Sequence, residues 1–462
     1  MKNKRSKFDN MNRKEAEDYV YKSYLKAQKY QDYNTKDSAK RRNDLTFDII
    51  RKKSMTPCVV VTGSKGKGSV ANMISQMLQT KYTVGLMTSP HIVDFCERFR
   101  VNGGKISDSD FTRYMSQIEP EIEAIDTHIP KNVCVSPMGI QTYLALYYFQ
   151  DMATQFNVFE CGKGAKYDDV NNVKHEYAVI NSIFLEHTRE LGETIEEIAE
   201  DKAYVITGEQ KCVYVAEQIP SVLKVIRDRA EKLDVSIKVY GQDFYAKDIQ
   251  FTKEGMIFDV VVGQNVYSKI SIPLLGEHQA KNCAMSFAVC KDVLEDLEFL
   301  REKDKFGNGD LLKKEDIFGK LSLSQIKESL LKLNWPGRME VIGNNPFILL
   351  DACINEASCE NVKKVLHHLE IKDATLIVGI PDDKDYAGVV KSMKEVASEI
   401  ILTKSQNPHY VFTKGQQERL QQERIVTQWT ESVSEAMNVA MQKNKPVVIL
   451  GTTSVIAEVK KM

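Results

Sequence analysis

Along the chain, short unbroken runs of apolar residues alternate with longer stretches in which apolar residues recur three or four positions apart. The unbroken runs predict buried strands at residues 59–61, 83–87, 156–159 and 178–180. The wider spacing predicts helices after residue 69, at 111–125 and at 140–152, with a kink or break at Pro120. This alternation of strands and helices is typical of an α/β domain with a parallel sheet.

The pattern changes between residues 213 and 273. Apolar and polar residues alternate there, which predicts antiparallel strands at 236–240, 248–251 and 256–260. A helix is expected to open at 275–282 and to end near residue 294, before a charged linker at 295–318 and a helix at 323–333. After residue 335, four further apolar runs alternate with helices and predict a second α/β unit, with strands at 348–350, 375–378, 400–402 and 447–450.

A glycine-rich turn follows the first predicted strand and reads TGSKGKGS at residues 62–69. The backbone N–H groups of such a turn, and the positive end of the next helix, suit a phosphate. Lys67 would add a charge at the terminal phosphates, and Ser69 a hydroxyl near a phosphate or Mg²⁺. The strict P-loop pattern is not met, because Val61 stands at its first glycine and Gly68 separates Lys67 from Ser69. A tight surface loop is the alternative, which the flanking strand and helix disfavour.

These patterns predict an α/β fold, with a P-loop-type parallel-sheet ATPase domain that carries a small antiparallel β subregion, and a C-terminal Rossmann-like α/β domain. The expected domains are an N-terminal helical extension at 1–45, a central domain at 46–318, a linker helix at 319–333 and a C-terminal domain at 334–462. In the extension, a modest apolar stripe predicts one helix, and a polar loop follows it.

Composition narrows the function classes. The 462 residues carry a net charge of −1, so no overall field attracts nucleic acid or an anionic membrane. The nine cysteines are scattered and include no CxxC pair, which indicates reduced thiols and a cytoplasmic protein. The basic N-terminus lacks the apolar region of a secretory signal, and no apolar run approaches a membrane span. We therefore expect neither a nucleic-acid nor a membrane partner.

Polar residues repeatedly follow the predicted strands: Ser89, Glu160 and His187 each come after one. The carboxyl ends of parallel strands share one edge of a sheet, so these side chains are expected to converge with Lys67. With a bound triphosphate they could complete one or two octahedral Mg²⁺ sites. Taken alone, Glu160 could pair with a lysine and His187 could be a structural histidine.

Several segments between residues 58 and 455 carry motifs of one family, in the same order. The first is the phosphate loop at residues 63–69. The others are the paired segments 85–92 and 97–103, the segment 160–171, the paired segments 186–192 and 198–203, the segment 276–282, the sequence WPGR at 335–338 and the sequence DKD at 383–385. On these motifs the chain resembles the Mur ligase superfamily, and within it the folylpolyglutamate synthase/dihydrofolate synthase branch.

The resemblance implies an ATP site and a metal site. The ATP phosphates would be bound by Gly63, Ser64, Lys65, Gly66, Lys67, Gly68 and Ser69. Ser89 and Glu160 would be ligands of a first Mg²⁺ and His187 of a second. Lys202 matches the family's carbamylated lysine, an N6-carboxylysine that turns a cation into an oxygen ligand; an unmodified lysine on phosphate is the alternative.

Three further residues would complete the nucleotide site. Asn282 matches an adenine-side contact, Arg338 an arginine that reaches the phosphates, and Asp351 a nearby nucleotide contact. The implied reaction is ATP-dependent amide ligation, in which an acceptor carboxylate becomes an acyl phosphate that an amine then attacks. Lys67, His187, Lys202 and Arg338 are the expected catalytic residues. The expected partners are a small-molecule carboxylate acceptor and L-glutamate, and a monomer is expected.

Departures from the family pattern leave the acceptor open. In the segment after residue 350, Ile354 replaces the family's histidine and Glu356 its proline, and Lys166 replaces an arginine. A folate is the first acceptor to consider, and a non-folate acid is the alternative. A nucleotide-binding relative with decayed ligase activity, or a simple P-loop kinase or ATPase, would explain fewer of the retained residues.

Overall fold

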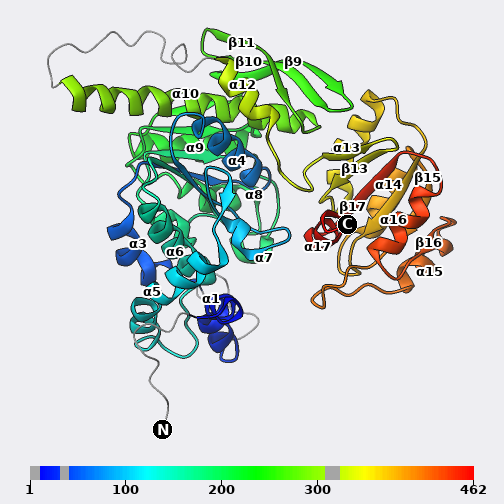
Figure 1. The fold of residues 1–462 in the computed structure, drawn as a ribbon, viewed down its shortest axis with the longest axis horizontal. Helices are drawn as coiled ribbons and strands as arrows, with labels where there is room; N and C mark the ends of the chain where they lie inside the picture. Colours follow the sequence, from blue (N-terminus) through cyan, green and yellow to red (C-terminus); the bar gives the residue numbers. More distant parts are fainter. Residues whose placement is uncertain (1–10, 32–40, 307–322) are drawn as a thin grey trace. The chain divides into compact units, whose positions relative to one another are not determined.

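The computed structural model describes residues 11–31, 41–306 and 323–462, which form two compact units (Figure 1). Unit 1 contains the described residues of Met1–His91, Phe95–Tyr245 and Asn282–Ile326. Unit 2 contains those of Ile92–Asp94, Ala246–Lys281 and Lys327–Met462. Within the described part of the chain, no helix has both the length and the apolar character needed to span a membrane.

Unit 1 is built on an eight-stranded sheet with the order β4-β3-β2-β5-β1-β6-β7-β8. Its strands are β1 Cys58–Thr62, β2 Val84–Met87, β3 Phe99–Val101, β4 Gly104–Lys105, β5 Phe156–Glu160, β6 Tyr177–Ile180, β7 Cys212–Val215 and β8 Ile237–Val239. The six strands from β2 to β8 in this order are parallel, and β3 and β4 form an antiparallel edge. The central strands are buried throughout, as their continuous apolar runs predicted.

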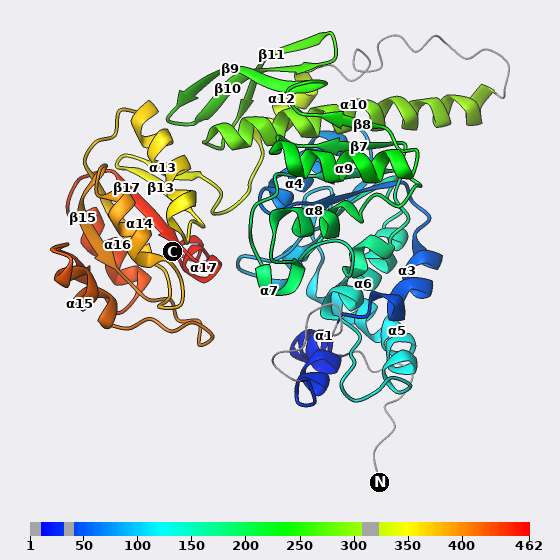
Figure 2. The ribbon, with the colours of Figure 1, turned by 180° about the vertical axis from the view of Figure 1, so that it is seen from behind.

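The helices of unit 1 surround this sheet (Figures 1 and 2). They are α1 Arg13–Gln28, α3 Phe47–Lys53, α4 Lys67–Leu78, α5 Asp108–Asp126, α6 Pro137–Asp151, α7 Thr188–Leu191, α8 Ile195–Ala203 and α9 Pro220–Lys232, with short 3-10 turns η1 Asn43–Thr46, η2 Phe95–Arg98 and η3 Asp169–Asn172. Helix α10, Glu277–Phe306, lies along β7 and β8, where Asp292 accepts hydrogen bonds of 2.5 Å from Tyr214 and from Lys238. Helix α5 contains Pro120 and is not split there.

Unit 2 holds two sheets. The larger has the order β12-β13-β17-β14-β15-β16, with β12 antiparallel and the rest parallel. Its strands are β12 Glu340–Asn344, β13 Phe347–Asp351, β14 Ala374–Gly379, β15 Ala397–Leu402, β16 Gln428–Trp429 and β17 Val447–Gly451. Its helices are α13 Glu356–His368, α14 Tyr386–Met393, α15 Gly415–Gln422, α16 Val433–Met441 and α17 Thr453–Lys460. The smaller, antiparallel sheet has the order β11-β10-β9 and consists of β9 Phe244–Thr252, β10 Gly255–Val262 and β11 Asn265–Ile272.

The predicted α/β class and both parallel sheets are confirmed, and two local predictions are wrong. The strand expected at 236–240 is not antiparallel: β8 pairs in parallel with β7, because α9 forms the crossover between them. Its polar alternation instead reflects its place at the sheet edge. The charged linker expected from residue 295 begins later, because α10 continues to Phe306. Glu, Lys, Leu and Arg are good helix formers, and a charged composition does not end a helix.

The rest of the predicted linker, residues 307–318, lies outside the described residues. Helix α12, Leu323–Leu331, falls within the predicted helix at 323–333. Residues 246–281 belong to compact unit 2, whereas the sequence pattern predicted them within the central domain at 46–318. The domain boundaries at residues 45, 318 and 333 stay predictions.

Candidate active site

The phosphate loop closes tightly against two asparagines. Strand β1 ends at Thr62, and Gly66, with φ of +77°, precedes α4 in the left-handed region. A Cβ atom on Gly66 would lie 2.4 Å from Asn181 Nδ2 and 3.1 Å from Asn282 Oδ1. Only glycine fits both this conformation and this space. The loop backbone is thus free to face a ligand at the N-terminus of α4.

Two lysine ammonium groups meet at one carbonyl of this loop. The Nζ atoms of Lys67 and Lys202 each donate to the Gly63 carbonyl at 3.0 Å. Lys202 has 1% of its side chain exposed, and Glu186 Oε1 lies 3.4 Å from its Nζ. Burial lowers the pKa of Lys202, and the charge of Lys67 lowers it further, while Glu186 opposes the shift. Two cations beside one loop favour the binding of a polyanion such as a triphosphate.

Glu160 and Ser89 are brought together by neighbouring parallel strands. Glu160 is the last residue of β5 and is 4% exposed. Its Oε2 accepts a hydrogen bond of 2.9 Å from the Ser89 backbone N–H, two residues beyond the end of β2. Strands β2 and β5 pair in parallel, so both residues lie at the carboxyl edge of the sheet, as does the phosphate loop after β1.

His187 stands before α7 with φ of +49°, and its side chain is 46% exposed. Its Nδ1 lies 3.8 Å from Glu190 Oε2, and Glu190 Oε1 accepts a hydrogen bond of 3.1 Å from Lys163. Partial burial lowers the pKa of His187, although Glu186 and Glu190 oppose the shift. The neutral imidazole that results is the form that binds metals.

The residues present fit a metal that completes its coordination with phosphate and water. Among the described residues, no group of three or more His, Cys, Asp or Glu side chains could hold an ion by itself. The buried Glu160 carboxylate and the neighbouring Ser89 offer hard oxygen donors beside the phosphate loop. Mg²⁺ binds in this way, through one or two carboxylates together with substrate phosphates.

Arg338 and Asp351 belong to unit 2 and are described apart from the residues above. Asp351 ends β13, and its Oδ2 accepts a hydrogen bond of 2.9 Å from the Met339 N–H. Arg338 Nη1 donates to the Gly337 carbonyl at 3.2 Å, and Gly337 donates its N–H to Glu340 Oε2 at 3.0 Å. Asp351 therefore holds the turn that carries Arg338.

Sequence reasoning missed Asn181, which organises the phosphate loop. It follows β6, packs against Gly63 and Gly66, and donates a hydrogen bond of 3.0 Å to Asn282 Oδ1. Asn282, predicted as an adenine contact, thereby lies beside the loop. The signal was available, since Asn181 is the polar residue directly after a predicted strand, as Glu160 is.

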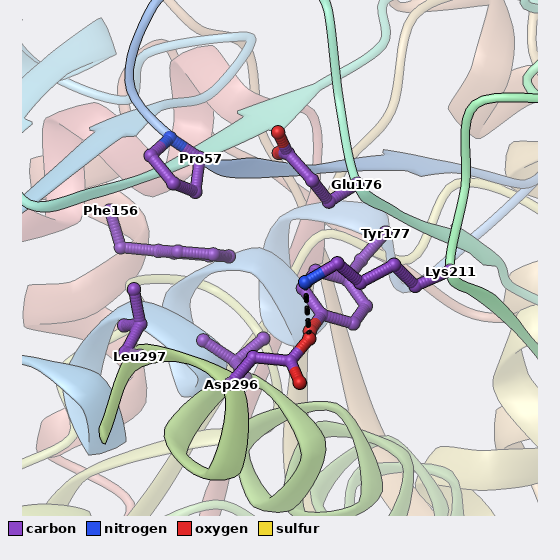
Figure 3. A pocket seen from close by; sticks show the side chains of 8 residues that line it. Pro57, Phe156, Glu176, Tyr177, Lys211, Asp296 and Leu297 are labelled. Atoms are coloured by element: carbon purple, nitrogen blue, oxygen red, sulfur yellow. Dashed lines mark hydrogen bonds and ion pairs between the residues drawn. The ribbon is translucent and has the colours of Figure 1, made fainter. Parts of the chain in front are cut away.

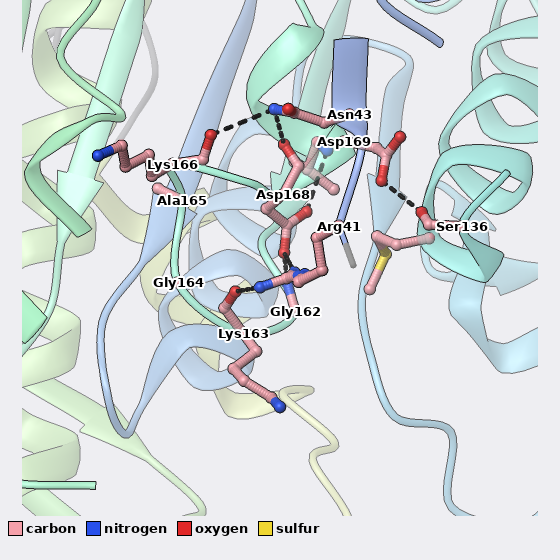
Figure 4. Close-up of polar contacts among 12 residues, drawn as sticks. Arg41, Asn43, Ser136, Gly162, Lys163, Gly164, Ala165, Lys166, Asp168 and Asp169 are labelled. Atoms are coloured by element: carbon pink, nitrogen blue, oxygen red, sulfur yellow. Dashed lines mark hydrogen bonds and ion pairs between the residues drawn. The ribbon is translucent and has the colours of Figure 1, made fainter. Parts of the chain in front are cut away.

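Sequence reasoning also missed how the loop after Glu160 is supported. Arg41 donates to the Lys163 carbonyl at 2.8 Å, and its Nη2 lies 3.5 Å from Asp168 Oδ2 (Figure 4). Asp169 is buried beside Thr46 and Ser136. Burial raises the pKa of Asp169 to about 6. No sequence motif predicts the role of Arg41, because its partners lie more than a hundred residues away in the sequence.

A cavity of about 150 Å³ lies at the amino-terminal ends of strands in the same sheet (Figure 3). Its lining includes Pro57, just before β1, and Phe156 and Tyr177, the first residues of β5 and β6. Asp296 accepts hydrogen bonds there from Tyr177 and, at 2.7 Å, from Lys211. No predicted site residue lines this cavity, so it is separate from the phosphate loop.

Comparison with known proteins gives two domain matches. Residues 61–290 match the Mur ligase middle domain, and residues 337–453 match the Mur ligase glutamate ligase domain. The dihydrofolate synthase/folylpolyglutamate synthase of Bacillus subtilis is 30% identical over 414 residues, which cover 87% of this chain and 89% of the relative. The folylpolyglutamate synthase of Lacticaseibacillus casei is 25% identical, over 87% of this chain and 88% of that protein.

Solved structures share the fold. Mycobacterium tuberculosis folylpolyglutamate synthase complexed with ADP has a TM-score of 0.78 at 22% identity, over 96% of this chain and 98% of that one. A complex of FPGS with AMPPCP and folate has a TM-score of 0.77 at 24% identity, over 98% of this chain and 99% of the other.

Proposed function

Because the chain belongs to the Mur ligase family, we propose that it is an ATP-dependent ligase that couples an amino acid to a carboxylate acceptor. Its relatives are named folylpolyglutamate and dihydrofolate synthases, and we assign L-glutamate and a folate as its substrates on that ground. The observation that carries the proposal is the meeting of Lys67 and Lys202 at the Gly63 carbonyl, on the sheet edge that also holds Glu160.

The phosphate loop would bind the ATP phosphates. Lys67, at the start of α4, and Lys202, on α8, both reach the loop and can exchange their bonds to the Gly63 carbonyl for phosphate oxygens. The N–H groups at the start of α4 add a second set of donors. Asn181 and Asn282 keep the loop in place from behind.

Glu160, Ser89 and His187 would hold one or two Mg²⁺ ions against the phosphates. When bound, the metal supplies positive charge that stabilises the transferring phosphoryl group. Lys202 is proposed to be carbamylated: burial and the charge of Lys67 lower the pKa of its amine, which favours the neutral form that adds CO₂ and releases a proton. The carbamate would supply an oxygen donor where the unmodified ammonium supplies a charge.

The reaction needs no nucleophile from the protein. The acceptor carboxylate attacks the γ-phosphorus, the bond to ADP breaks, and an acyl phosphate forms. The amine of glutamate then attacks the acyl carbon and expels phosphate, which leaves an amide. Lys67 and Arg338 would both stabilise the negative charge that develops in the first step. The turn held by Asp351 limits the orientations open to Arg338.

A second acceptor class has one observation in its favour. The segment after β13 carries Cys353 and Ile354 where the family motif has an alanine and a histidine, and Cys353 is buried against Cys359, with 3.4 Å between the sulfur atoms. The polar histidine contact is therefore replaced by an apolar one in the domain named for glutamate ligation. A non-folate acid or another amino acid is the second candidate.

We place the enzyme in the cytoplasm as a monomer. The nine cysteines are all free and buried, which supports a reducing compartment. The monomer rests on the family resemblance.

The test is phosphate release from MgATP by the purified protein, with amino acids and acceptors varied independently. Release that requires both L-glutamate and dihydropteroate or tetrahydrofolate is expected. Release with glutamate and a different acid would keep the ligase and change the acceptor. If MgATP binds and no acceptor pair releases phosphate, the ligase proposal is wrong.

A further inference from the structure

The loop after β5 is held by a segment from far upstream in the sequence. This loop, residues 161–172, follows Glu160, and segment 41–46 lies against it (Figure 4). Segment 41–46 precedes the first strand and falls outside both matched domains, which begin at residues 61 and 337. Its contribution to the site is therefore not implied by the domain matches.

Arg41 makes the charged contact of this segment. Its guanidinium donates to the Lys163 carbonyl at 2.8 Å and lies 3.5 Å from Asp168 Oδ2. Asp168 has no exposed side-chain surface, and its two oxygens accept the N–H groups of Gly162 at 2.9 Å and Val170 at 3.0 Å. Asp168 thus folds the loop onto itself, and Arg41 supplies the positive charge beside it.

Hydrogen bonds from uncharged side chains complete the attachment of segment 41–46 to the loop. Thr46 donates to Asp169 at 2.5 Å, and Asn172 donates to the Asn43 carbonyl at 2.7 Å. On the other side of the loop, Asp201, the neighbour of Lys202, accepts the Ala165 N–H at 2.8 Å. The loop is therefore fixed between segment 41–46 and α8.

Lys166, within the loop, does not take this role. Lys166 stands where the family motif has an arginine, and its Nζ lies 4.7 Å from the Tyr204 ring centre. In Figure 4 its ammonium points away from Asp168, whereas Arg41 points toward it. The planar guanidinium of Arg41 reaches the Lys163 carbonyl and Asp168 together, which a single ammonium does poorly.

The loop connects Arg41 to Glu160 and to His187, the two predicted metal ligands that lie near its residues. It begins at Cys161, the residue after Glu160. Lys163, whose carbonyl accepts from Arg41, donates its ammonium to Glu190 at 3.1 Å, and Glu190 lies 3.8 Å from His187.

We propose that Arg41 is a positioning residue of the ligase site: by holding the Lys163 carbonyl and Asp168, it orders the loop that sets Glu160 and His187 for the metal–nucleotide complex. The inference rests on the proposed function and deepens it. Arg41 contacts no reacting atom and acts through the loop.

The test compares Arg41→Met with Arg42→Met. Arg42 is the matched control, because it is the adjacent arginine and pairs at 2.7 Å with Asp44 on the surface. Binding of Mn²⁺ in the presence of ADP is followed by electron paramagnetic resonance, and binding of ADP with EDTA by calorimetry. We expect Arg41→Met to weaken Mn²⁺ binding about tenfold, as for other residues that orient metal ligands, with metal-free ADP binding unchanged. Arg42→Met should match the wild type, and Arg41→Lys should fall between.

Other results overturn the inference. If Arg41→Met lowers the melting temperature but binds Mn²⁺ as the wild type does, Arg41 only stabilises the fold. Should Arg41→Met fail to fold, Arg41→Lys takes its place: Mn²⁺ affinity equal to the wild type overturns the proposal, and weaker affinity supports it. A wild-type protein that binds no Mn²⁺ with ADP would instead contradict the proposed function.

Discussion

At the scale of single residues, the Gly63 carbonyl brings the two lysines of the predicted nucleotide site together. Two ammonium groups share it, and one of them, on Lys202, is almost fully buried. A buried lysine beside another cation loses its proton more readily than an exposed one, and the pKa of Lys202 is lowered for these two reasons. The same environment suits either a phosphate contact or the addition of CO₂ to the neutral amine.

Isotope labelling distinguishes these two states of Lys202. We expect wild-type protein equilibrated with ¹³C-bicarbonate and Mg²⁺ to give a carbamate carbon signal, which Lys202→Ala lacks. Lys67→Ala should keep the signal, because burial, the larger cause of the lowered pKa of Lys202, remains, and it should lose ATP turnover by about 10²-fold or more. Exposed Lys232→Ala controls for loss of a surface lysine. No signal from the wild type would mean that Lys202 meets the phosphates as an ammonium.

At the scale of elements, the strand–turn–helix of β1 and α4 depends on Gly66. Gly66→Ala places a Cβ 2.4 Å from Asn181 Nδ2 and keeps φ at +77°. We expect MgATP binding, measured by calorimetry, to be lost because Asn181 and the loop must separate. Gly103 is the matched control: it has the same φ of +77°, and its nearest neighbour, Gln79, lies 3.6 Å away. Both variants should lose about 1–2 kcal/mol of stability. Loss of MgATP binding in Gly103→Ala as well would contradict the steric argument.

The attachment of segment 41–46 gives a pH-dependent term in stability. Burial raises the pKa of Asp169 to about 6 from 3.8. A raised folded-state pKa means that stability from this group is present below about pH 4 and is lost as the pH rises through about 6. Relative to Asp169→Asn, the unfolding free energy of the wild type should therefore fall by roughly 2 kcal/mol from pH 4 to pH 7. Urea unfolding at several pH values measures it, and a constant difference would contradict the shifted pKa.

The pattern of apolar residues predicted the helices and strands well where burial in the core determines the secondary structure. The strands that became β1, β5 and β6 are unbroken apolar runs, and they are buried on both faces. The strand at 236–240 was misassigned because alternation describes burial of one face and does not reveal the direction of the partner strand. The predicted end of helix α10 near residue 294 is too early, because a charged composition alone does not mark a linker.

The site could be predicted only where local sequence fixes a side chain's position. That Glu160 and Ser89 meet could be predicted, because strand ends in a parallel sheet share one edge; their role as metal ligands stays a prediction. Asn181 obeys the same rule and was passed over. Arg41 could not be found, since its contact with Asp168 joins residues 127 positions apart in sequence and has no pattern of its own.

At the scale of the whole molecule, the predicted site residues fall in two units. Lys67, Glu160 and Lys202 lie in unit 1 with the phosphate loop, and Arg338 and Asp351 lie in unit 2. A ligase that passes through an acyl phosphate must exclude water from that intermediate. We therefore expect nucleotide binding to depend on the residues of unit 1, and the transition state of phosphoryl transfer to depend on Arg338 as well.

This division can be tested with Arg338→Ala. If the guanidinium acts mainly in the transition state, ADP affinity should stay within about threefold of the wild type, while single-turnover phosphoryl transfer should fall about 10²–10³-fold. Arg424→Ala, an exposed arginine of unit 2, should leave both quantities unchanged. Calorimetry with ADP and rapid-quench measurement of phosphate with saturating acceptor supply the two numbers. Equal loss of affinity and rate would instead show that Arg338 binds the nucleotide in the ground state, so that unit 2 takes part from the first binding step.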